Sequence, residues 1–338
     1  MRRIERRNFL AAAAALAAAP LARAQSASGT RTLGVLSPSP PRTPEYWAKS
    51  PVIAKLKTLG WVYGQNLRIE GAYSSGDIDR LPELAEGLVK KGVDVLWAIS
   101  PPAAVAAARA TRTIPIVFVH VVWPIELGLG ESLSRPGGNV TGVASIADPN
   151  VLAKPVEYLL EIVRDFRRGF ALTPSPVLYR TVTGGTFSPQ LHTEMDRIMD
   201  RLGIERRVYE VADVKDIDAA LEDALEIRAQ AMYVGSSPLL VAEMKRIVDF
   251  ALRHRLPSGF IESQFVAAGG LLSYGSDAWG TLFQSMDYVD AILRGAKPAE
   301  LPIQLPKKLE LAINRRTSNL LGLTIPQPLL LRADKVIE

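Results

Sequence analysis

The chain has 338 residues, of which 48% are apolar, 22% charged and 7% aromatic. This length and composition suffice for two domains with separate cores, and they exclude a disordered chain and a polytopic membrane protein. The formal net charge is +5, but residues 1–24 hold five arginines and one glutamate, so 35 basic and 34 acidic residues remain. This near balance gives no sign of a nucleic-acid partner, and we expect none.

Residues 1–24 have the three-part layout of an export signal. Arginines precede the apolar stretch Phe9–Ala19, and Ala22-Arg23-Ala24 has the small-x-small pattern of a cleavage site. Because Arg6-Arg7-Asn8-Phe9-Leu10 resembles a twin-arginine motif, we expect twin-arginine export and cleavage after Ala24, with a general secretory signal as the alternative. The chain contains no cysteine to carry a lipid. We therefore expect a protein free in the periplasm.

From residue 32 onward, β-rich runs alternate with amphipathic segments. Leu81, Leu84, Ala85 and Leu88 recur at helical spacing, and Gly92 ends that segment. The order strand, helix, strand implies right-handed crossovers and a parallel sheet with both faces covered. The predicted strands of this half are 32–36, 67–73, 93–99, 116–121 and 140–145.

A second series of the same kind follows, with three connections between the two series. Crossings are expected at 140–145 and 269–275, and at the extended connector 298–306 that follows a helix at 279–294. The sequence thus predicts an α/β fold of two Rossmann-like lobes joined by a three-strand hinge. Lobe 1 would comprise 32–145 and 275–302, and lobe 2 146–274 and 303–338. The other elements expected here are helices at 153–163, 191–202, 217–228 and 239–254, strands at 169–172, 204–211, 231–234 and 309–313, and a final helix from 315.

The strand ends are the expected ligand site, because open parallel sheets bind ligands beyond the carboxyl ends of their strands. Two such lobes would close on a small molecule in the cleft between them. The strand-end loops contain hydroxyls, prolines and aromatic rings, which suit a small molecule held by a few hydrogen bonds and an apolar wall. The candidate ligand-binding residues are Ser37, Tyr46, Ser100, Pro101, His120, Trp123, Thr173, Ser236, Glu262 and Tyr274.

Several of these candidates have an equally ordinary structural role. His120 and Trp123 lie in and directly after an apolar strand, so both also suit the core. Ser100 and Ser236 also suit helix N-caps. Tyr274 lies on an expected crossing, where hinge packing is the alternative.

Three charged loop residues complete the list of possible contacts. Glu262 is the best carboxylate for a ligand amine, with a solvated loop residue as the alternative. Arg42 and Arg180 are the loop arginines that would pair with a ligand carboxylate, although most loop arginines are only solvated.

The sequence contains no recognisable catalytic or metal-binding motif. Its three histidines, His120, His192 and His254, lack metal-ligand spacing, and there is no nucleophile elbow, phosphate-binding loop or dinucleotide fingerprint. We therefore expect no enzyme activity, no metal and no cofactor.

Six strings, taken in order, resemble one bacterial family over nearly all of residues 32–338: Leu33–Ser37, Gly60–Leu67, Ile114–Val119, Ser134–Gly142, Gly269–Gly275 and Leu320–Pro326. This family is the ABC-transporter substrate-binding proteins with the type I periplasmic fold, of the kind that includes tryptophan- and tyrosine-binding proteins. The resemblance implies a periplasmic receptor that delivers a solute to an inner-membrane ABC permease, and we expect a monomer. A receptor subunit for a membrane sensor and, further away, an exported α/β enzyme are the alternatives.

Three loops depart from the pattern of the family. Ile99-Ser100-Pro101 replaces Gly-Thr-Pro, Trp123-Pro124 replaces Asp-Pro, and Thr173-Pro174-Ser175-Pro176 replaces Asn-Pro-x-Asn-Pro. Loss of Asp and Asn weakens the case for an α-ammonium group, because a buried cation needs acceptors. We expect a small organic solute of neutral, carboxylated or aromatic character, with an amino acid left open. Trp123 would stack on it, and helix N-termini near Ser37 and Ser100 would take an anionic end.

Overall fold

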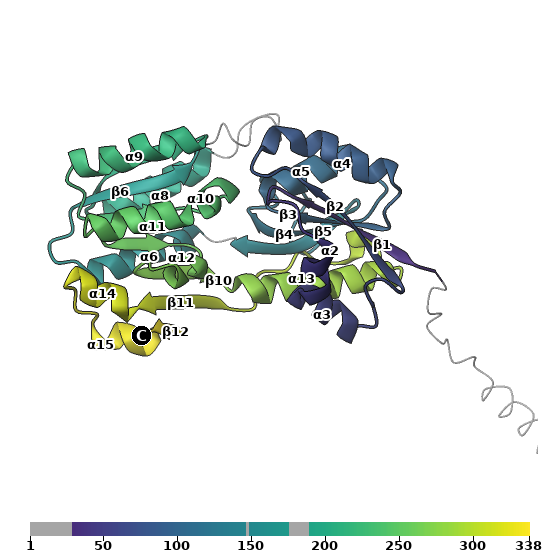
Figure 1. The fold of residues 1–338 in the computed structure, drawn as a ribbon. Coiled ribbons are helices and arrows are strands. Elements are labelled where there is room, and N and C mark those ends of the chain that lie inside the picture. Colours follow the sequence, from purple (N-terminus) through teal and green to yellow (C-terminus); the bar gives the residue numbers. More distant parts are fainter. Residues whose placement is uncertain (1–28, 147–148, 176–188) are drawn as a thin grey trace, which may run out of the picture. The chain divides into compact units, whose positions relative to one another are not determined.

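Two separate sheets organise the chain from Arg31 to the C-terminus (Figure 1). The computed structural model describes residues 29–146, 149–175 and 189–338. The predicted leader with its cleavage site after Ala24, and the loop residue Arg180, lie outside the described residues.

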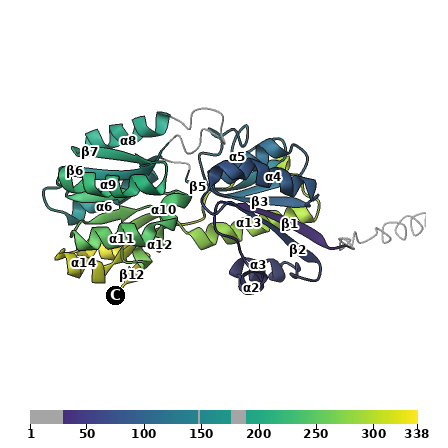
Figure 2. The ribbon, with the colours of Figure 1, turned by 45° about the horizontal axis from the view of Figure 1, so that its top comes forward.

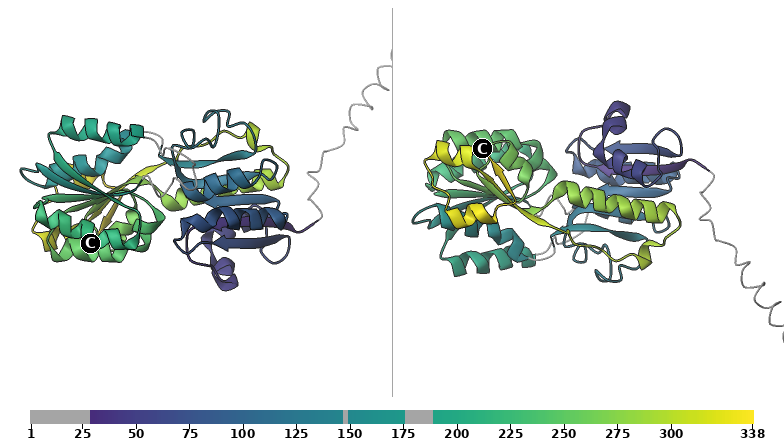
Figure 3. Two further views of the ribbon diagram at one scale, coloured as in Figure 1. Left: turned by 90° about the horizontal axis from the view of Figure 1, so that it is seen from above. Right: turned by 90° about the horizontal axis from the view of Figure 1, so that it is seen from below.

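The first sheet has five strands in the order β2-β1-β3-β4-β5, and every neighbouring pair is parallel. The two central strands β3 and β4 are almost wholly apolar, as expected for a sheet that has helices on both faces (Figure 3). The strands are β1 (Arg31–Ser37), β2 (Leu67–Tyr73), β3 (Val95–Ile99), β4 (Ile116–Val122) and β5 (Val140–Ile146).

Within the described ranges, five helices cover the first sheet. Helices α4 (Leu81–Lys90) and α5 (Pro101–Ala110) lie on one face, with a short 3-10 turn at Ile78–Arg80 before α4 (Figure 2). The other face is covered by α2 (Pro44–Lys49), α3 (Pro51–Thr58) and α13 (Ala278–Leu293). Three of the four residues that the helical spacing placed on one side of α4 are buried: Leu81, Ala85 and Leu88.

The second sheet has seven strands in the order β12-β11-β10-β9-β8-β6-β7. All pairs are parallel except β10 and β11, which are antiparallel. The prediction of parallel sheets therefore fails at this one pair, because the chain leaves after β10, forms α13 against the first sheet and re-enters in the opposite direction. The strands are β6 (Arg168–Pro174), β7 (Glu205–Val211), β8 (Ala231–Val234), β9 (Ser258–Phe260), β10 (Leu272–Ser276), β11 (Leu309–Asn314) and β12 (Lys335–Ile337).

Helices also cover both faces of the second sheet. The single helix expected at 239–254 is wrong, because Glu243 leaves the helical conformation and divides it into α10 and α11. The expected crossing at 269–275 largely coincides with β10, so the chain leaves the second sheet only after Ser276. The helices are α6 (Pro149–Ile162), α8 (Pro189–Leu202), α9 (Val214–Glu226), α10 (Pro238–Ala242), α11 (Met244–Arg253), α12 (Ser263–Ala267), α14 (Arg315–Leu321) and α15 (Gln327–Arg332).

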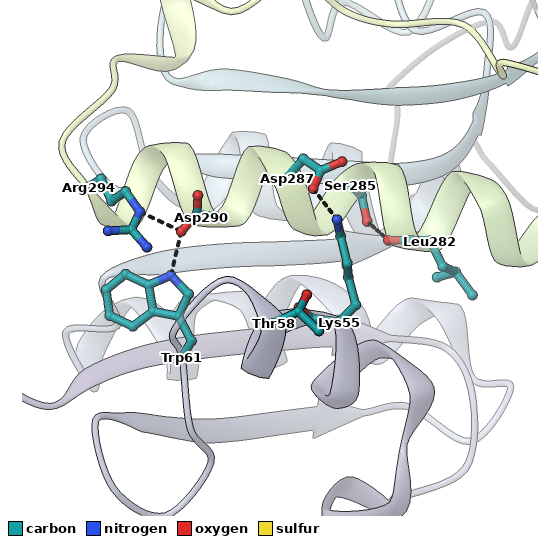
Figure 4. A network of polar contacts seen from close by, with 8 residues as sticks. All are labelled: Lys55, Thr58, Trp61, Leu282, Ser285, Asp287, Asp290 and Arg294. Atoms are coloured by element: carbon teal, nitrogen blue, oxygen red, sulfur yellow. Dashed lines mark hydrogen bonds and ion pairs between the residues drawn. The ribbon is translucent and has the colours of Figure 1, made fainter.

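Helix α13 is attached to the first sheet although β10, which precedes it, belongs to the second. The Trp61 indole N–H and the Arg294 Nε both donate to Asp290 Oδ1, at 2.8 and 2.7 Å (Figure 4). An ion pair of 2.6 Å joins Lys55 to Asp287, so the helix has polar ties to α3 and to the loop after it. These contacts, and the buried hydrogen bond of 3.1 Å from the Trp97 indole to Ser285 Oγ, fix α13 on the first sheet.

A 3-10 turn at Pro298–Glu300 begins the return to the second sheet. Gln304 then bridges to Val143 of β5 before the chain enters β11. The connection at Asp277, between β10 and α13, and residues 301–308 are thus the two later crossings between the sheets.

Candidate functional site

The strand order of each sheet creates a switch point. Along the first sheet, β2 lies on one side of β1 and β3 on the other, so the two crossovers diverge at the carboxyl ends of β1 and β3. In the second sheet, β7 and β8 flank β6 in the same way. Ligands of open α/β sheets bind at such points. The predicted residues Ser37 and Ser100 end the strands at the first switch, and Thr173 and Ser236 lie at the second.

At the first switch, Ser37 is buried, and its hydroxyl already has hydrogen-bond partners within the protein. Its hydroxyl donates to Ser39 Oγ at 3.0 Å and accepts the Ser39 N–H at 3.2 Å, which shapes the loop after β1. Its carbonyl accepts the N–H of Ser74, at the end of β2. Ser74 is 1% exposed, and its hydroxyl has no hydrogen-bond partner among the described residues. Sequence reasoning missed Ser74 because its burial depends on the loop that folds over it.

Ser100 has the most unusual backbone of the candidates. Its φ of 92° and ψ of 158° lie in a region that is essentially reserved for glycine, and a following proline disfavours positive φ further. Its N–H donates to the Val119 carbonyl at 3.0 Å, and its carbonyl accepts from Ala104 N at the start of α5. The residue is 7% exposed, and its hydroxyl has no partner within the described ranges. A strained backbone together with an unsatisfied buried hydroxyl is typical of a ligand clamp.

The expected anion site at helix N-termini is not supported by these helices. Pro101 and Pro102 occupy the first two positions of α5 and have no N–H to donate, so Ala103 is the first residue of the helix that can. Near Ser37, α2 has only six residues and begins with Pro44. The predicted site residue Pro101 is buried and, as a proline, has no N–H to offer a ligand.

His120 and Trp123 both have a left-handed backbone, with φ of 57° and 46°, at an irregularity between β4 and β5. The His120 ring Nε2 lies 3.2 Å from the Ala278 carbonyl and from Thr281 Oγ1, at the start of α13. Trp123 is 8% exposed and belongs to an apolar cluster that includes Ile146. Both side chains therefore have structural contacts at the crossings, which is the alternative role that the sequence left open.

Aromatic rings lie beside the first switch. Tyr46 is 40% exposed, its ring meets Trp47 edge-on at 5.3 Å, and the Arg42 guanidinium lies 4.5 Å above it. Tyr73 ends β2 and pairs in register with Ser37. Burial raises the pKa of Tyr73 to about 12, an effect that Trp47 and Arg42 partly oppose. Sequence reasoning missed Tyr73, although it was the last residue of a correctly predicted strand.

At the second switch, the structure brings Ser236 and Glu262 together from the ends of the neighbouring strands β8 and β9. The Ser236 hydroxyl donates to Glu262 Oε1, and the Gln264 amide donates to Glu262 Oε2. Ser237, not Ser236, caps α10, because Ser237 Oγ accepts the Leu240 N–H at 3.2 Å. The Thr173 hydroxyl at the end of β6 is buried, with no partner in the part of the chain that the structure describes.

Tyr274 lies apart from both switches. Its ring packs edge-on against Tyr158 of α6 at 5.6 Å, and its strand, β10, is covered by that helix. This is a packing contact beside the crossing.

The described residues show neither a metal-binding cluster nor a membrane-spanning helix. They contain no group of three or more His, Asp or Glu side chains that would hold a metal ion. None of the helices among them is both long and apolar enough to cross a bilayer.

Residues 45–337 match the family model described as ABC transporter substrate binding protein. A tyrosine-binding protein of Clostridioides difficile (strain R20291) is 27% identical over 279 residues, which are 80% of this chain and 75% of that protein.

Two solved structures have the same fold with a TM-score of 0.79. One is a conserved domain protein of Vibrio cholerae, which is 26% identical and is matched over 91% of this chain and 99% of its own. The other is an ABC domain of Streptococcus pneumoniae in complex with L-Trp, 24% identical, matched over 91% of this chain and 100% of its own. The predicted α/β fold of the type I periplasmic kind is confirmed.

Proposed function

The chain belongs to the family of ABC transporter substrate-binding proteins, and from that premise we propose that it is the periplasmic solute receptor of an ABC importer. It binds a small organic molecule between its two lobes and delivers it chemically unchanged to an inner-membrane permease. In this proposal lobe 1 contains the first sheet and lobe 2 the second, with the expected lobe boundaries at 145, 275 and 302 moved to the ends of β5 at Ile146 and β10 at Ser276 and kept at residue 302. The leader 1–24 directs export and is cleaved after Ala24, and the mature protein acts as a monomer.

The observation that carries the proposal is the match between the two switch points. Each ends in hydroxyl side chains, and each contains a buried hydroxyl that lacks a partner among the described residues: Ser74 and Ser100 at the first, Thr173 at the second. An unsatisfied buried hydroxyl costs about 1–3 kcal/mol, which a bound solute with matching polar groups recovers. Because each sheet has such a switch point, the two together support binding of a solute between the lobes better than binding to one sheet alone.

The solute is small, organic and aromatic, with an aromatic amino acid as the leading case. Tyr46 and Tyr73 beside the first switch supply aromatic surface of the kind that packs against a ring. The C. difficile relative is a tyrosine-binding protein, which supports the same class. No catalytic step is proposed. The described strand ends place one hydroxyl against a carboxylate, Ser236 against Glu262, and a carboxylate is too weak a base to activate a serine hydroxyl by itself.

Thermal unfolding with a panel of aromatic amino acids, neutral aromatics and aromatic acids tests the proposal. A ligand at 100 times its Kd stabilises the folded state by about 2.7 kcal/mol. We expect stabilisation by at least one aromatic compound, and recovery of that compound unchanged by mass spectrometry. Stabilisation by none of them contradicts the solute class, and recovery of a converted product contradicts the receptor function.

A further inference from the structure

The carboxylate of Glu262 carries a negative charge for which the described residues provide no cation. Its two oxygens accept from neutral donors, the Ser236 hydroxyl and the Gln264 amide. The residue is half-buried, and the described ion pairs elsewhere on the second sheet join other acids to arginine or lysine.

This arrangement differs from an ordinary surface acid. The two hydrogen bonds hold the carboxylate in place at the ends of β8 and β9, while its remaining lone pairs stay available. A carboxylate that is partly desolvated and not neutralised attracts a cation more strongly than a solvated one does. Ser236 does not cap the following helix, since Ser237 does, so its hydroxyl serves to orient Glu262.

The described strand ends offer few donors and no well-placed cation for binding an anionic group of a solute. Pro101 and Pro102 remove two backbone donors from the start of α5, the helix next to the first switch. Arg42, in the loop after β1, is exposed and stacked on Tyr46. The hydroxyls of Ser74 and Ser100 are neutral donors.

We propose that the receptor recognises its solute mainly through a cationic nitrogen, which binds Glu262, and that a carboxylate on the solute contributes less. This inference rests on the proposed function and reverses the sequence-based preference for a neutral or carboxylated solute. Trp123 stands where the family pattern has an aspartate. In this proposal Glu262, on the second sheet, supplies the carboxylate instead.

The test compares three compounds of one shape by isothermal titration: L-tyrosine, tyramine, which lacks the carboxylate, and 3-(4-hydroxyphenyl)propionate, which lacks the ammonium. A charged hydrogen bond corresponds to about a 10- to 100-fold change in Kd. We expect the propionate to bind at least tenfold more weakly than tyrosine, and tyramine to lose less than the propionate does.

The variant Glu262→Gln keeps the size of the side chain and removes its charge. We expect it to weaken tyramine binding at least tenfold and to leave propionate binding nearly unchanged. Glu226→Gln, an exposed acid at the end of α9, is the matched control and leaves all three affinities unchanged. Thermal unfolding without ligand verifies that both variants fold.

The possible failures are distinguishable. If the propionate binds as tightly as tyrosine, or if Glu262→Gln weakens all three compounds equally, the inference is overturned while the receptor function stands. If none of the three compounds binds the wild-type protein, the aromatic solute class fails and the inference fails with it.

Discussion

Replacing Ser100 by glycine separates the stability of the protein from its function. The present backbone of Ser100 costs about 1–3 kcal/mol, which glycine does not incur. The variant also removes a buried hydroxyl without a described partner, and such a group costs about 1–3 kcal/mol. Against these gains, glycine loses more backbone entropy on folding, about 0.5–1 kcal/mol. We expect the two gains to be realised only in part. Ser100→Gly should therefore stabilise the ligand-free protein by about 1–2 kcal/mol.

The assay is chemical and thermal unfolding of the ligand-free protein together with titration of the solute. A gain of 1 kcal/mol raises the Tm of a protein of this size by about 1–2 °C, because unfolding releases about 2.1 cal/mol/K of entropy per residue. Loss of one hydrogen bond to the solute weakens binding by about two- to tenfold. Ser100→Ala is the control, because it removes the hydroxyl and keeps the strained Cβ; we expect it to lose the same affinity with a smaller gain in stability. A fall in Tm for Ser100→Gly, or wild-type affinity in both variants, refutes the reasoning.

Two further predictions concern Tyr73 and the leader. Burial raises the pKa of Tyr73 to about 12 in the folded protein, so its contribution to stability is complete below pH 10 and is lost as the pH rises towards 12. The free energy of unfolding should therefore fall less steeply over this range in Tyr73→Phe, measured by urea denaturation, and equal slopes would contradict the buried position of the hydroxyl. Replacing both Arg6 and Arg7 by lysine should stop export by the twin-arginine route, so that the uncleaved chain accumulates in the cytoplasm on fractionation; normal export would favour the general secretory route.

The succession of strands and helices predicted the strand ends well. Once alternating strands and helices are recognised, right-handed crossovers leave few possible sheet orders, and the ends of the strands follow. Ser37, Ser100, Thr173 and Ser236 were placed at these ends from the sequence, and the structure has them there. What each hydroxyl contacts was not predictable, because it depends on the loops that fold over it.

Other features needed the three-dimensional contacts. The bond between Ser236 and Glu262 joins residues 26 positions apart through the three-residue strand β9, too short for periodicity to reveal. The antiparallel pair β10–β11 results from a crossing, which leaves no local pattern in either strand. The division of 239–254 at Glu243 was missed because every residue there is compatible with a helix, and tertiary packing decides the break.

A crystal structure of the protein with the solute retained through native purification tests the central claim most directly. The account predicts one unchanged small molecule, with Ser100 within hydrogen-bond distance on one lobe and Glu262 within hydrogen-bond distance on the other. A solute bound to only one sheet, or away from both switch points, would contradict it.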